Sequence, residues 1–463
     1  MSQPAGATLE SVILPPDFDL IDLHAAQPSR YPFLLESVAN KLSGHGGSPA
    51  TFDILFGFPG ATLRLDPDFR LQGAVDPAET SFLTALDHWW KQTGPLPGVA
   101  PPLPFHGGWF LFLGYELLCE VEPGIPVQSL PGVPVALATR IPIALVRDRA
   151  SGCAWIVAEP GREEAINAMR SDLLNTGVRS HRRAVARRLV TDTLEPDAAD
   201  FLEGVEKIRA LIASGDVYQV NLARRWTAAL VPEVSTADVY RQLRSTNPAP
   251  FAGIAGLDGW SVVSSSPERL VRCRDGVAET RPIAGTRPTA GDPAREEARR
   301  RDLLTHPKER AEHIMLIDLE RNDLGRVCEP GSIEVNEFMT VESYAHVHHI
   351  VSNVRGRLRA GVSPGALIRA VFPGGTITGC PKVRCMEIIN KLERTPRGPY
   401  SGSMGYLNRD GSCDLNILIR SFVVRDRELS FAAGSGIVAD SIPAHELEET
   451  RAKAKGLLLA LTG

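Results

Sequence analysis

Strand-like runs separated by tight turns fill the second half of the chain and set the strongest limit on its fold. Each run is rich in apolar or alternating residues and is bounded by Gly, Pro, Asn or Asp, the usual pattern of β-strands. Helical runs are set apart from them, so we expect an α+β fold with a mostly antiparallel sheet. The expected strands cover 217–230, 251–257, 260–273, 276–288, 402–408, 414–426 and 428–440.

The only linker that the sequence indicates lies near residues 178–200, where a basic segment interrupts the pattern. It divides an N-terminal region, residues 1–190, from a C-terminal region, residues 191–463. Within the N-terminal region, 135–148 and 153–160 are predicted to form a pair of strands.

Two helices carry paired acidic residues. The first covers 308–328 and holds Glu309 and Glu312, whose three-residue spacing places both carboxylates on one face. The second runs from 443 to about 461 and holds Glu446 and Glu449. If the two pairs meet, they need a cation, and oxygen ligands suit Mg²⁺. The alternative interpretation is that both helices present solvated faces.

Composition excludes several classes of protein. The 463-residue chain has a net charge of -5, which favours neither nucleic acid nor an anionic membrane as a partner. The N-terminus lacks the pattern of a signal peptide, and no apolar run reaches the length of a membrane span. Seven scattered cysteines without a CxxC pair argue against a zinc site or a disulfide framework, and indicate a cytoplasmic protein.

Several stretches offer groups that could bind or protonate an acidic ligand. Glu268, in a Ser/Pro turn, is a candidate general acid, and a salt-bridged turn is its alternative. The Gly-rich loop in 372–389 opens a helix whose free N–H groups favour an anion. The other candidate donors are Gly285, Thr286, Tyr400, Arg420, Gly434, Gly436 and Lys453, flanked by Arg281 and Arg287.

Three histidines, His346, His348 and His349, stand close together in the sequence. They could bind a metal, lie in the core or supply one acid/base group. On the strand 217–230, Gln219 and Asn221 share one face. The whole inventory fits a small substrate with two carboxylates that Mg²⁺ bridges to the protein.

Eight ordered motifs in residues 200–463 resemble the chorismate-utilising enzymes, a family that includes anthranilate synthase, aminodeoxychorismate synthase, isochorismate synthase and salicylate synthase. The N-terminal third is similar more weakly, through YPFLLES and GGWFLFLGYE. The resemblance implies an anthranilate synthase large-subunit-like fold of two packed, mostly antiparallel sheets wrapped by helices. The motifs are GDVYQVNLARR, SSPERL, PIAGTRP, KERAEHIMLIDLERNDLGRVC, GGTITGCPKVRCMEII, RGPYSGSMGY, AGSGIVADS and EETRAKAK.

The resemblance also implies roles for the candidate residues. Glu312 and Glu449 would bind Mg²⁺, with Glu309 and Glu446 in or beside that shell, and the metal would hold the ring carboxylate of chorismate. Glu268 would protonate the departing C4 hydroxyl. The enolpyruvyl carboxylate would be held by Tyr400, Arg420 and the backbone at Gly434 and Gly436, with Gly285, Thr286 and Lys453 at the same ligand and His349 as the active-site histidine.

Three positions bear on the reaction. Members that add water carry a lysine base where this chain has Gln219, so we expect ammonia as the nucleophile, supplied by a separate glutamine amidotransferase. Asn221 and the neighbouring motifs resemble aminodeoxychorismate synthase. Ala284 resembles anthranilate synthase instead, because most aminodeoxychorismate synthases have a nucleophilic lysine there. We therefore expect an aminodeoxychorismate synthase without a covalent lysine intermediate, with anthranilate synthase and an inactive chorismate-binding scaffold as alternatives.

The stretch YPFLLES resembles the part of anthranilate synthases that forms a tryptophan pocket. Glu36 and Ser37 could therefore hold an amino acid, and buried packing is an equal interpretation.

Overall fold

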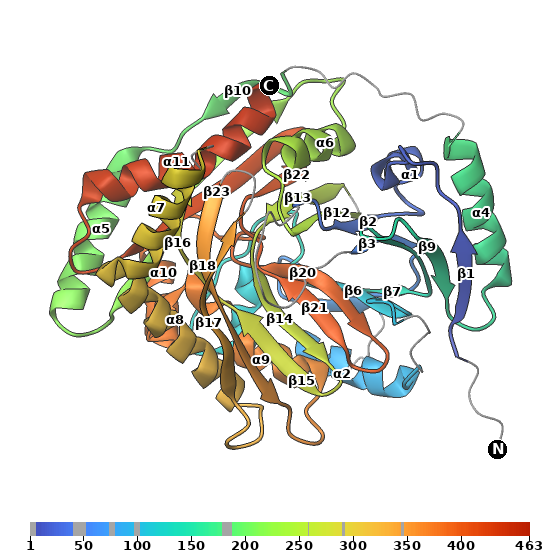
Figure 1. The fold of residues 1–463 in the computed structure, drawn as a ribbon, viewed down its shortest axis with the longest axis horizontal. Coiled ribbons are helices and arrows are strands. Elements are labelled where there is room, and N and C mark those ends of the chain that lie inside the picture. Colours follow the sequence, from blue (N-terminus) through green and yellow to red (C-terminus); the bar gives the residue numbers. More distant parts are fainter. Residues whose placement is uncertain are drawn as a thin grey trace.

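A computed structural model describes residues 6–39, 52–73, 79–96, 102–177, 188–257, 259–288, 292–343 and 347–463. Two large sheets form its centre, and helices cover their outer faces (Figure 1). No helix in these ranges is long and apolar enough to cross a membrane.

The first sheet joins strands from both halves of the sequence, and its described pairings are antiparallel. A short strand, β19 (Gly379–Cys380), pairs with β11 off the main path. In spatial order the strands are β1 (Thr8–Val12), β9 (Ala154–Ala158), β8 (Ile143–Asp148), β3 (Phe52–Gly57), β2 (Phe33–Glu36), β12 (Phe251–Leu257), β13 (Trp260–Ser266), β22 (Ser421–Arg425), β23 (Glu428–Ile437), β11 (Gln219–Leu230) and β10 (Val190–Leu194).

The second sheet is built in the same way, with antiparallel pairings among its described strands. Strand β17 (Glu334–Ser343) pairs with β18 off the main path. In spatial order the others are β16 (Ile283–Pro288), β18 (Val347–Arg357), β15 (Val277–Arg281), β14 (Arg269–Arg274), β21 (Cys413–Asn416), β20 (Ser403–Asn408), β6 (Gly108–Leu113), β7 (Ala136–Ile141), β4 (Thr62–Leu65) and β5 (Leu71–Gly73).

Apolar side chains from both sheets form the core between them. Phe33 of the first sheet stacks on Phe110 of the second, with ring centroids 4.0 Å apart, and both rings are fully buried. Strand alternation explains this contact, since every second side chain of each strand faces the other sheet. The expected α+β fold with two packed antiparallel sheets is confirmed.

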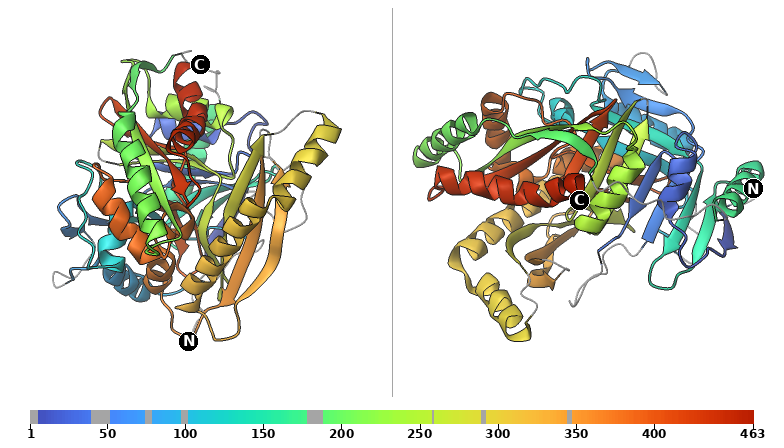
Figure 2. Two further views of the ribbon diagram at one scale, coloured as in Figure 1. Left: turned by 90° about the vertical axis from the view of Figure 1, so that its left-hand side faces the viewer. Right: turned by 90° about the horizontal axis from the view of Figure 1, so that it is seen from above.

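Helices shield the outer faces of both sheets. Those on the first sheet include α5, α6 and α11, and those on the second include α2 and α8. Helix α7 projects away from the body (Figure 2). The helices are α1 (Leu20–Ala26), α2 (Phe82–Thr93), α3 (Leu118–Val121), α4 (Glu163–Gly177), α5 (Ala198–Ala213), α6 (Thr236–Thr246), α7 (Pro293–Thr305), α8 (Pro307–Gly325), α9 (Pro364–Val371), α10 (Lys382–Leu392) and α11 (Pro443–Thr462), with 3₁₀ turns η1 (Tyr115–Leu117) and η2 (Gly375–Ile377).

N-terminal strands enter both sheets. Strand β2 pairs with β12 in the first sheet, and β6 pairs with β20 in the second. The sequence interpretation of 135–148 as one partner of 153–160 was wrong in part. Pro142 separates β7 from β8, which lie in different sheets, and only β8 pairs with β9.

Two other runs that were expected to be single strands also divide between the sheets. The run 260–273 breaks at Pro267, with β13 in the first sheet and β14 in the second. The run 414–426 breaks at 417–420, where Arg420 has a positive φ of 51°, and β21 and β22 again lie in different sheets. Each break makes a crossover between the sheets.

Candidate active site

The two crossovers run side by side and bring Glu268 and Arg420 to the same region. The backbone N–H of Ile417 donates to the carbonyl of Glu268 at 3.0 Å, and the N–H of Ser265 donates to the carbonyl of Arg420 at 3.2 Å. Ser266 Oγ adds a hydrogen bond to the Ile417 carbonyl at 2.5 Å. The fold thus fixes an acid and a guanidinium where the chain passes from one sheet to the other.

Glu268 is 5% exposed, and burial raises its pKa to about 7. The positive charges of Lys453 and Arg420 and the Ile283 amide work in the opposite direction, because they favour the carboxylate. A carboxyl group with this pKa holds a proton for much of the time near neutral pH. It can therefore donate that proton to a leaving group, as the sequence analysis expected.

Gly434 and Gly436 lie on β23 and have no side chains, so they leave room for polar groups of neighbouring residues. We call the surface that these two residues form the glycine floor. A Cβ atom at Gly434 would lie 2.5 Å from Asn221 Oδ1 and 2.7 Å from the Tyr400 hydroxyl. A Cβ at Gly436 would lie 2.2 Å from Gln219 Nε2. A side chain at either position would displace these polar groups, so glycine lets them keep their places.

Tyr400 is positioned by residues that the sequence analysis did not identify. The Arg397 guanidinium lies 5.4 Å from the centre of the Tyr400 ring and binds both carboxylate oxygens of Glu393, at 2.6 and 2.8 Å. Burial raises the pKa of Tyr400 to about 12, so its hydroxyl stays a hydrogen-bond donor. The RGPYSG motif contains Arg397 three residues before Tyr400, so the sequence did carry a signal that could have identified Arg397.

The four predicted acidic residues lie on α8 and α11, close to their expected bounds. Each has a partner from within the protein. Glu312 accepts from Gln219 Nε2 at 3.0 Å, and Glu309 accepts from Arg287 at 2.9 Å. Glu449 pairs with Lys453 at 2.8 Å, and Ser435 donates to Glu446.

The charges of two other carboxylates affect Glu312. Burial raises its pKa, and the negative charges of Glu309 and Glu449 raise it further. In the part of the chain that the structure describes, no three His, Cys, Asp or Glu side chains already converge as a metal cage. Mg²⁺ commonly uses only one or two carboxylates and completes its shell with water and substrate oxygens, so this donor set fits it chemically.

Lys453 links the acidic residues to the glycine floor. Besides its ion pair with Glu449, its Nζ donates to the Gly434 carbonyl at 2.9 Å. Its positive charge also lowers the pKa of Glu312 and of Glu268, although burial dominates at both. One cation therefore lies near the candidate metal ligands and near the candidate acid.

His349 is placed by the pairing of β16 with β18, which sets it opposite Thr286 and sets Ala284 opposite Ile350. Its Nδ1 lies 3.2 Å from the Gly285 carbonyl, and because a carbonyl only accepts, Nδ1 carries the proton. Burial, helped by the charge of Arg420, lowers the pKa of His349 to about 4. The imidazole is therefore neutral at physiological pH.

His348 does not join His349. The side chain of His348 points to the opposite face of β18 from His349. There its ring contacts Ser343 Oγ at 2.8 Å and Glu296 of α7. His346 lies outside the described residues. The possible metal site of three histidines is thus not supported, since neighbouring strand residues point to opposite faces.

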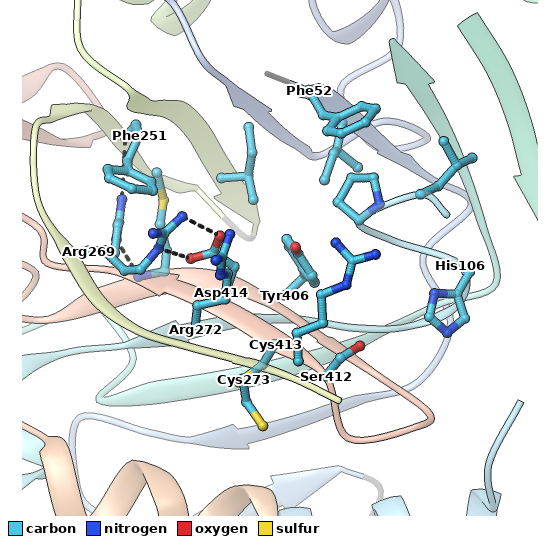
Figure 3. A pocket seen from close by; sticks show the side chains of 18 of the residues that line it. Phe52, His106, Phe251, Arg269, Arg272, Cys273, Tyr406, Ser412, Cys413 and Asp414 are labelled. Atoms are coloured by element: carbon cyan, nitrogen blue, oxygen red, sulfur yellow. Dashed lines mark hydrogen bonds and ion pairs between the residues drawn. The ribbon is translucent and has the colours of Figure 1, made fainter. Parts of the chain in front are cut away.

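Glu36 and Ser37 lie elsewhere, beside a cavity of about 360 Å³ that Figure 3 shows. Glu36 lines the cavity, but its carboxylate accepts from Tyr240 and Arg244, each at 2.7 Å, and from Arg149 at 3.3 Å. Ser37 is not among the lining residues, and its N–H donates to Asp53.

Both apolar and charged side chains line this cavity. Phe52 and Phe251 supply rings, while Arg269 binds Asp414 through two hydrogen bonds of 2.9 and 3.1 Å (Figure 3). Of the two predicted residues only Glu36 lines this cavity, and an amino-acid pocket here stays a prediction.

Comparison with known proteins identifies the class. Residues 67–459 match the family model described as chorismate binding enzyme, so the chain belongs to that family. It is 42% identical to an anthranilate synthase component I-like protein of Synechocystis, over 83% of this chain and 78% of that protein. It is 40% identical to aminodeoxychorismate synthase component 1 of Bacillus subtilis, over 82% of each chain.

A solved structure supports the same assignment. Anthranilate synthase component I from Streptococcus pneumoniae aligns with a TM-score of 0.78 and 30% identity, over 90% of this chain and 95% of that one. The chain is therefore an enzyme of the anthranilate synthase and aminodeoxychorismate synthase class that acts on chorismate.

Proposed function

We propose that this enzyme is an aminodeoxychorismate synthase component I, which converts chorismate and ammonia into 4-amino-4-deoxychorismate and water. The observation that carries the proposal is the amide pair on β11. Gln219 cannot act as a base for water, and Asn221 places a second carboxamide against Gly434 and Tyr400. Ammonia needs no base to become a nucleophile, so this floor suits ammonia.

The proposed reaction has two substitutions. One ammonia attacks C2 while the C4–O bond breaks, and Glu268 gives its proton to the departing hydroxyl, which leaves as water. The C2 ammonium group returns one proton to Glu268. A second ammonia then attacks C4, the C2–N bond breaks, and Glu268 returns its proton to the C2 amine, which leaves as ammonia. The new C4 ammonium group then gives one proton back to the Glu268 carboxylate, so the net change replaces a hydroxyl by an amine.

This route needs no nucleophilic side chain at position 284, where Ala284 is 6% exposed. Free ammonia takes the place that a lysine amine would occupy. The intermediate would then be a small molecule held in the site rather than one bonded to the protein.

The substrate's two carboxylates have separate candidate partners. Tyr400, Arg420 and the backbone at Gly434 would hold the enolpyruvyl carboxylate, and the raised pKa of Tyr400 keeps its proton available for that bond. Glu312 and Glu449 would hold Mg²⁺, with Glu309 and Glu446 beside them. When bound, the metal would neutralise the ring carboxylate.

A glutamine amidotransferase would supply ammonia as a separate subunit, as the component names of the relatives suggest. A separate lyase would turn the product into p-aminobenzoate for folate synthesis. The test is to incubate the enzyme with chorismate, Mg²⁺ and excess ammonium salt, with and without such a lyase. Formation of p-aminobenzoate only when the lyase is present supports the proposal.

Anthranilate synthase is the second candidate, because Ala284 and several relatives favour it. It shares the first substitution and then eliminates pyruvate. Fluorescent anthranilate in the same assay, without a lyase, would replace our proposal with this one. An inactive scaffold would form neither product, even with the amidotransferase supplied.

A further inference from the structure

The edge of β11 that faces away from β23 is interrupted, and a cavity of about 300 Å³ lies at the gap. Strand β19 pairs with β11 only at Gln219 and Val220, and β10 pairs with it from Thr227 onward. Residues 222–225 of β11 lie between these two pairings, and all of them line the cavity. The gap in the strand pairing thus accounts for the position of the cavity.

Four arginines line this cavity, and three of them are already paired with carboxylates. The three ion pairs are Arg224 with Glu195 at 2.9 Å, Arg394 with Asp200 at 2.7 Å and Arg397 with Glu393 at 2.6 Å. The fourth is Arg225, which forms no ion pair with a carboxylate in the part of the chain that the structure describes. The cavity therefore contains one guanidinium whose charge no neighbouring side chain neutralises directly.

The hydrogen bonds of Arg225 go only to uncharged acceptors. Its guanidinium donates to the backbone carbonyls of Pro396 and Arg397, the latter at 2.9 Å, and to Ser430 Oγ at 3.3 Å. Its Nε has no hydrogen-bond partner among the described residues. A charged group that is removed from water without an opposite charge costs free energy, and a bound anion would offset that cost.

Other charges around Arg225 do not replace such an anion. Burial lowers the pKa of Arg225, although the negative charges of Glu116, Glu393 and Glu428 act in the opposite direction without forming an ion pair with it. Asp197 also lines the cavity, but it is exposed and caps the start of helix α5. Water and the helix terminus therefore stabilise the charge of Asp197.

Much of the remaining lining is apolar. These side chains come from β10, α5, β11, α10 and β23, and they are Leu194, Phe201, Leu222, Leu392 and Ala432. A cavity that combines apolar walls with one unpaired guanidinium suits a small ligand with one carboxylate and an apolar ring.

We propose that this cavity binds a small aromatic carboxylate of the aminobenzoate class, with its carboxylate on Arg225 and its ring among the apolar side chains. Both candidate reactions lead to such a molecule, since anthranilate is one product and p-aminobenzoate forms from the other after a lyase acts. Only the choice of ligand rests on the proposed function, and it holds for either position of the amine. The cavity is thus a site that senses the end product.

The cavity shares a wall with the candidate substrate site. Tyr400 lines it, and the Arg397 guanidinium lies 5.4 Å from the centre of the Tyr400 ring. A carboxylate on Arg225 competes with the carbonyls of Pro396 and Arg397 for the same N–H groups, and so loosens the segment that carries Tyr400. Binding should therefore raise the KM for chorismate, and the inhibition should level off at saturating ligand, because chorismate and the ligand bind at different places.

The test is isothermal titration calorimetry with p-aminobenzoate and anthranilate, each titrated separately into the wild type and two variants. Arg225→Gln should raise the Kd about tenfold, because a charge-assisted hydrogen bond is lost. Ala432→Leu should also raise the Kd, because Ala432 is buried and lines the cavity, which the larger side chain would fill. Aniline, which lacks the carboxylate, should not bind to the wild type.

Arg427→Gln is the matched control. Arg427 also donates to two backbone carbonyls, those of Leu230 at 2.7 Å and Pro232 at 3.0 Å, but it does not line this cavity. Its substitution should leave the Kd unchanged. Circular dichroism on every variant separates loss of folding from loss of the site.

Three results distinguish this inference from the proposed function. No binding of either aminobenzoate to the wild type would overturn the inference and leave the proposed function as it is. Binding that chorismate displaces completely, and that both folded variants retain, would place the ligand in the substrate site and would also overturn the inference alone. Binding that both variants weaken, by an enzyme whose product is anthranilate, would support the inference and overturn the proposed function.

Discussion

Gln219 Nε2 lies 3.0 Å from Glu312 Oε1, and this bond joins the first residue of strand β11 to helix α8. It connects the residue expected to meet the nucleophile with a residue expected to bind the metal. A substitution at Gln219 or Glu312 is therefore expected to affect both the nucleophile and the metal. Its effects on the binding of Mg²⁺, chorismate and ammonia must be measured separately.

Glu268→Gln should lower kcat by 10²- to 10⁴-fold with little change in the KM for chorismate, because the amide keeps the shape of the side chain but donates no proton. Initial rates over a range of chorismate concentrations provide the measurement. A variant with more than a tenth of the wild-type kcat would show that Glu268 is not the acid.

The pH profile of the wild type should have a falling limb near pH 7. Burial raises the pKa of Glu268 to about 7, so the protonated acid predominates below that pH and is lost above it. Free ammonia must be held constant at each pH, because its concentration otherwise rises with pH. A rate that stays flat from pH 6 to pH 9 under this condition would contradict the assignment.

Glu449→Gln should raise the Mg²⁺ concentration needed for half-maximal activity at least tenfold, since one of two carboxylate ligands is lost. Titration of the EDTA-treated enzyme with Mg²⁺ measures this. Glu448→Gln is the neighbouring control, because Glu448 is exposed and pairs with Arg451 instead. Equal Mg²⁺ requirements in both variants would remove Glu449 from the metal site.

Lys382→Met should lower the free energy of unfolding by about 3–5 kcal/mol, because it leaves the buried carboxylate of Asp323 without its cation. The two groups lie 2.6 Å apart, with side chains 6% and 4% exposed. Urea denaturation gives the value. The exposed pair of Arg321 and Asp318 is the comparison, and Arg321→Ala should cost less than about 1 kcal/mol.

The acidic helices and the strand β11 could be predicted because their signals are local. The spacing of Glu309 and Glu312 sets a helix face, and the alternation at Gln219 and Asn221 sets a strand face. The fold class followed from the order of such elements together with the family resemblance.

Contacts between distant segments could not be predicted. The bond between Arg397 and Glu393 depends on how α10 enters the turn before β20, and the ion pairs of Glu36 depend on strands that come together only in the folded chain. The crossovers at Pro267 and Arg420 looked like uninterrupted strands, since a strand that changes sheets keeps its alternating pattern. Local sequence patterns thus predicted the helices and strands, whereas the partners of the buried charged residues could be identified only from the structure.

The most direct test of the central claim is the position of nitrogen in the product. The enzyme is incubated with chorismate, Mg²⁺ and ¹⁵N-ammonium, and the product is examined by mass spectrometry and NMR. We predict one ¹⁵N bonded to C4, with the enolpyruvyl group retained and no protein-bound intermediate. A ¹⁵N label at C2 of an aromatic product, with free pyruvate, would contradict the claim.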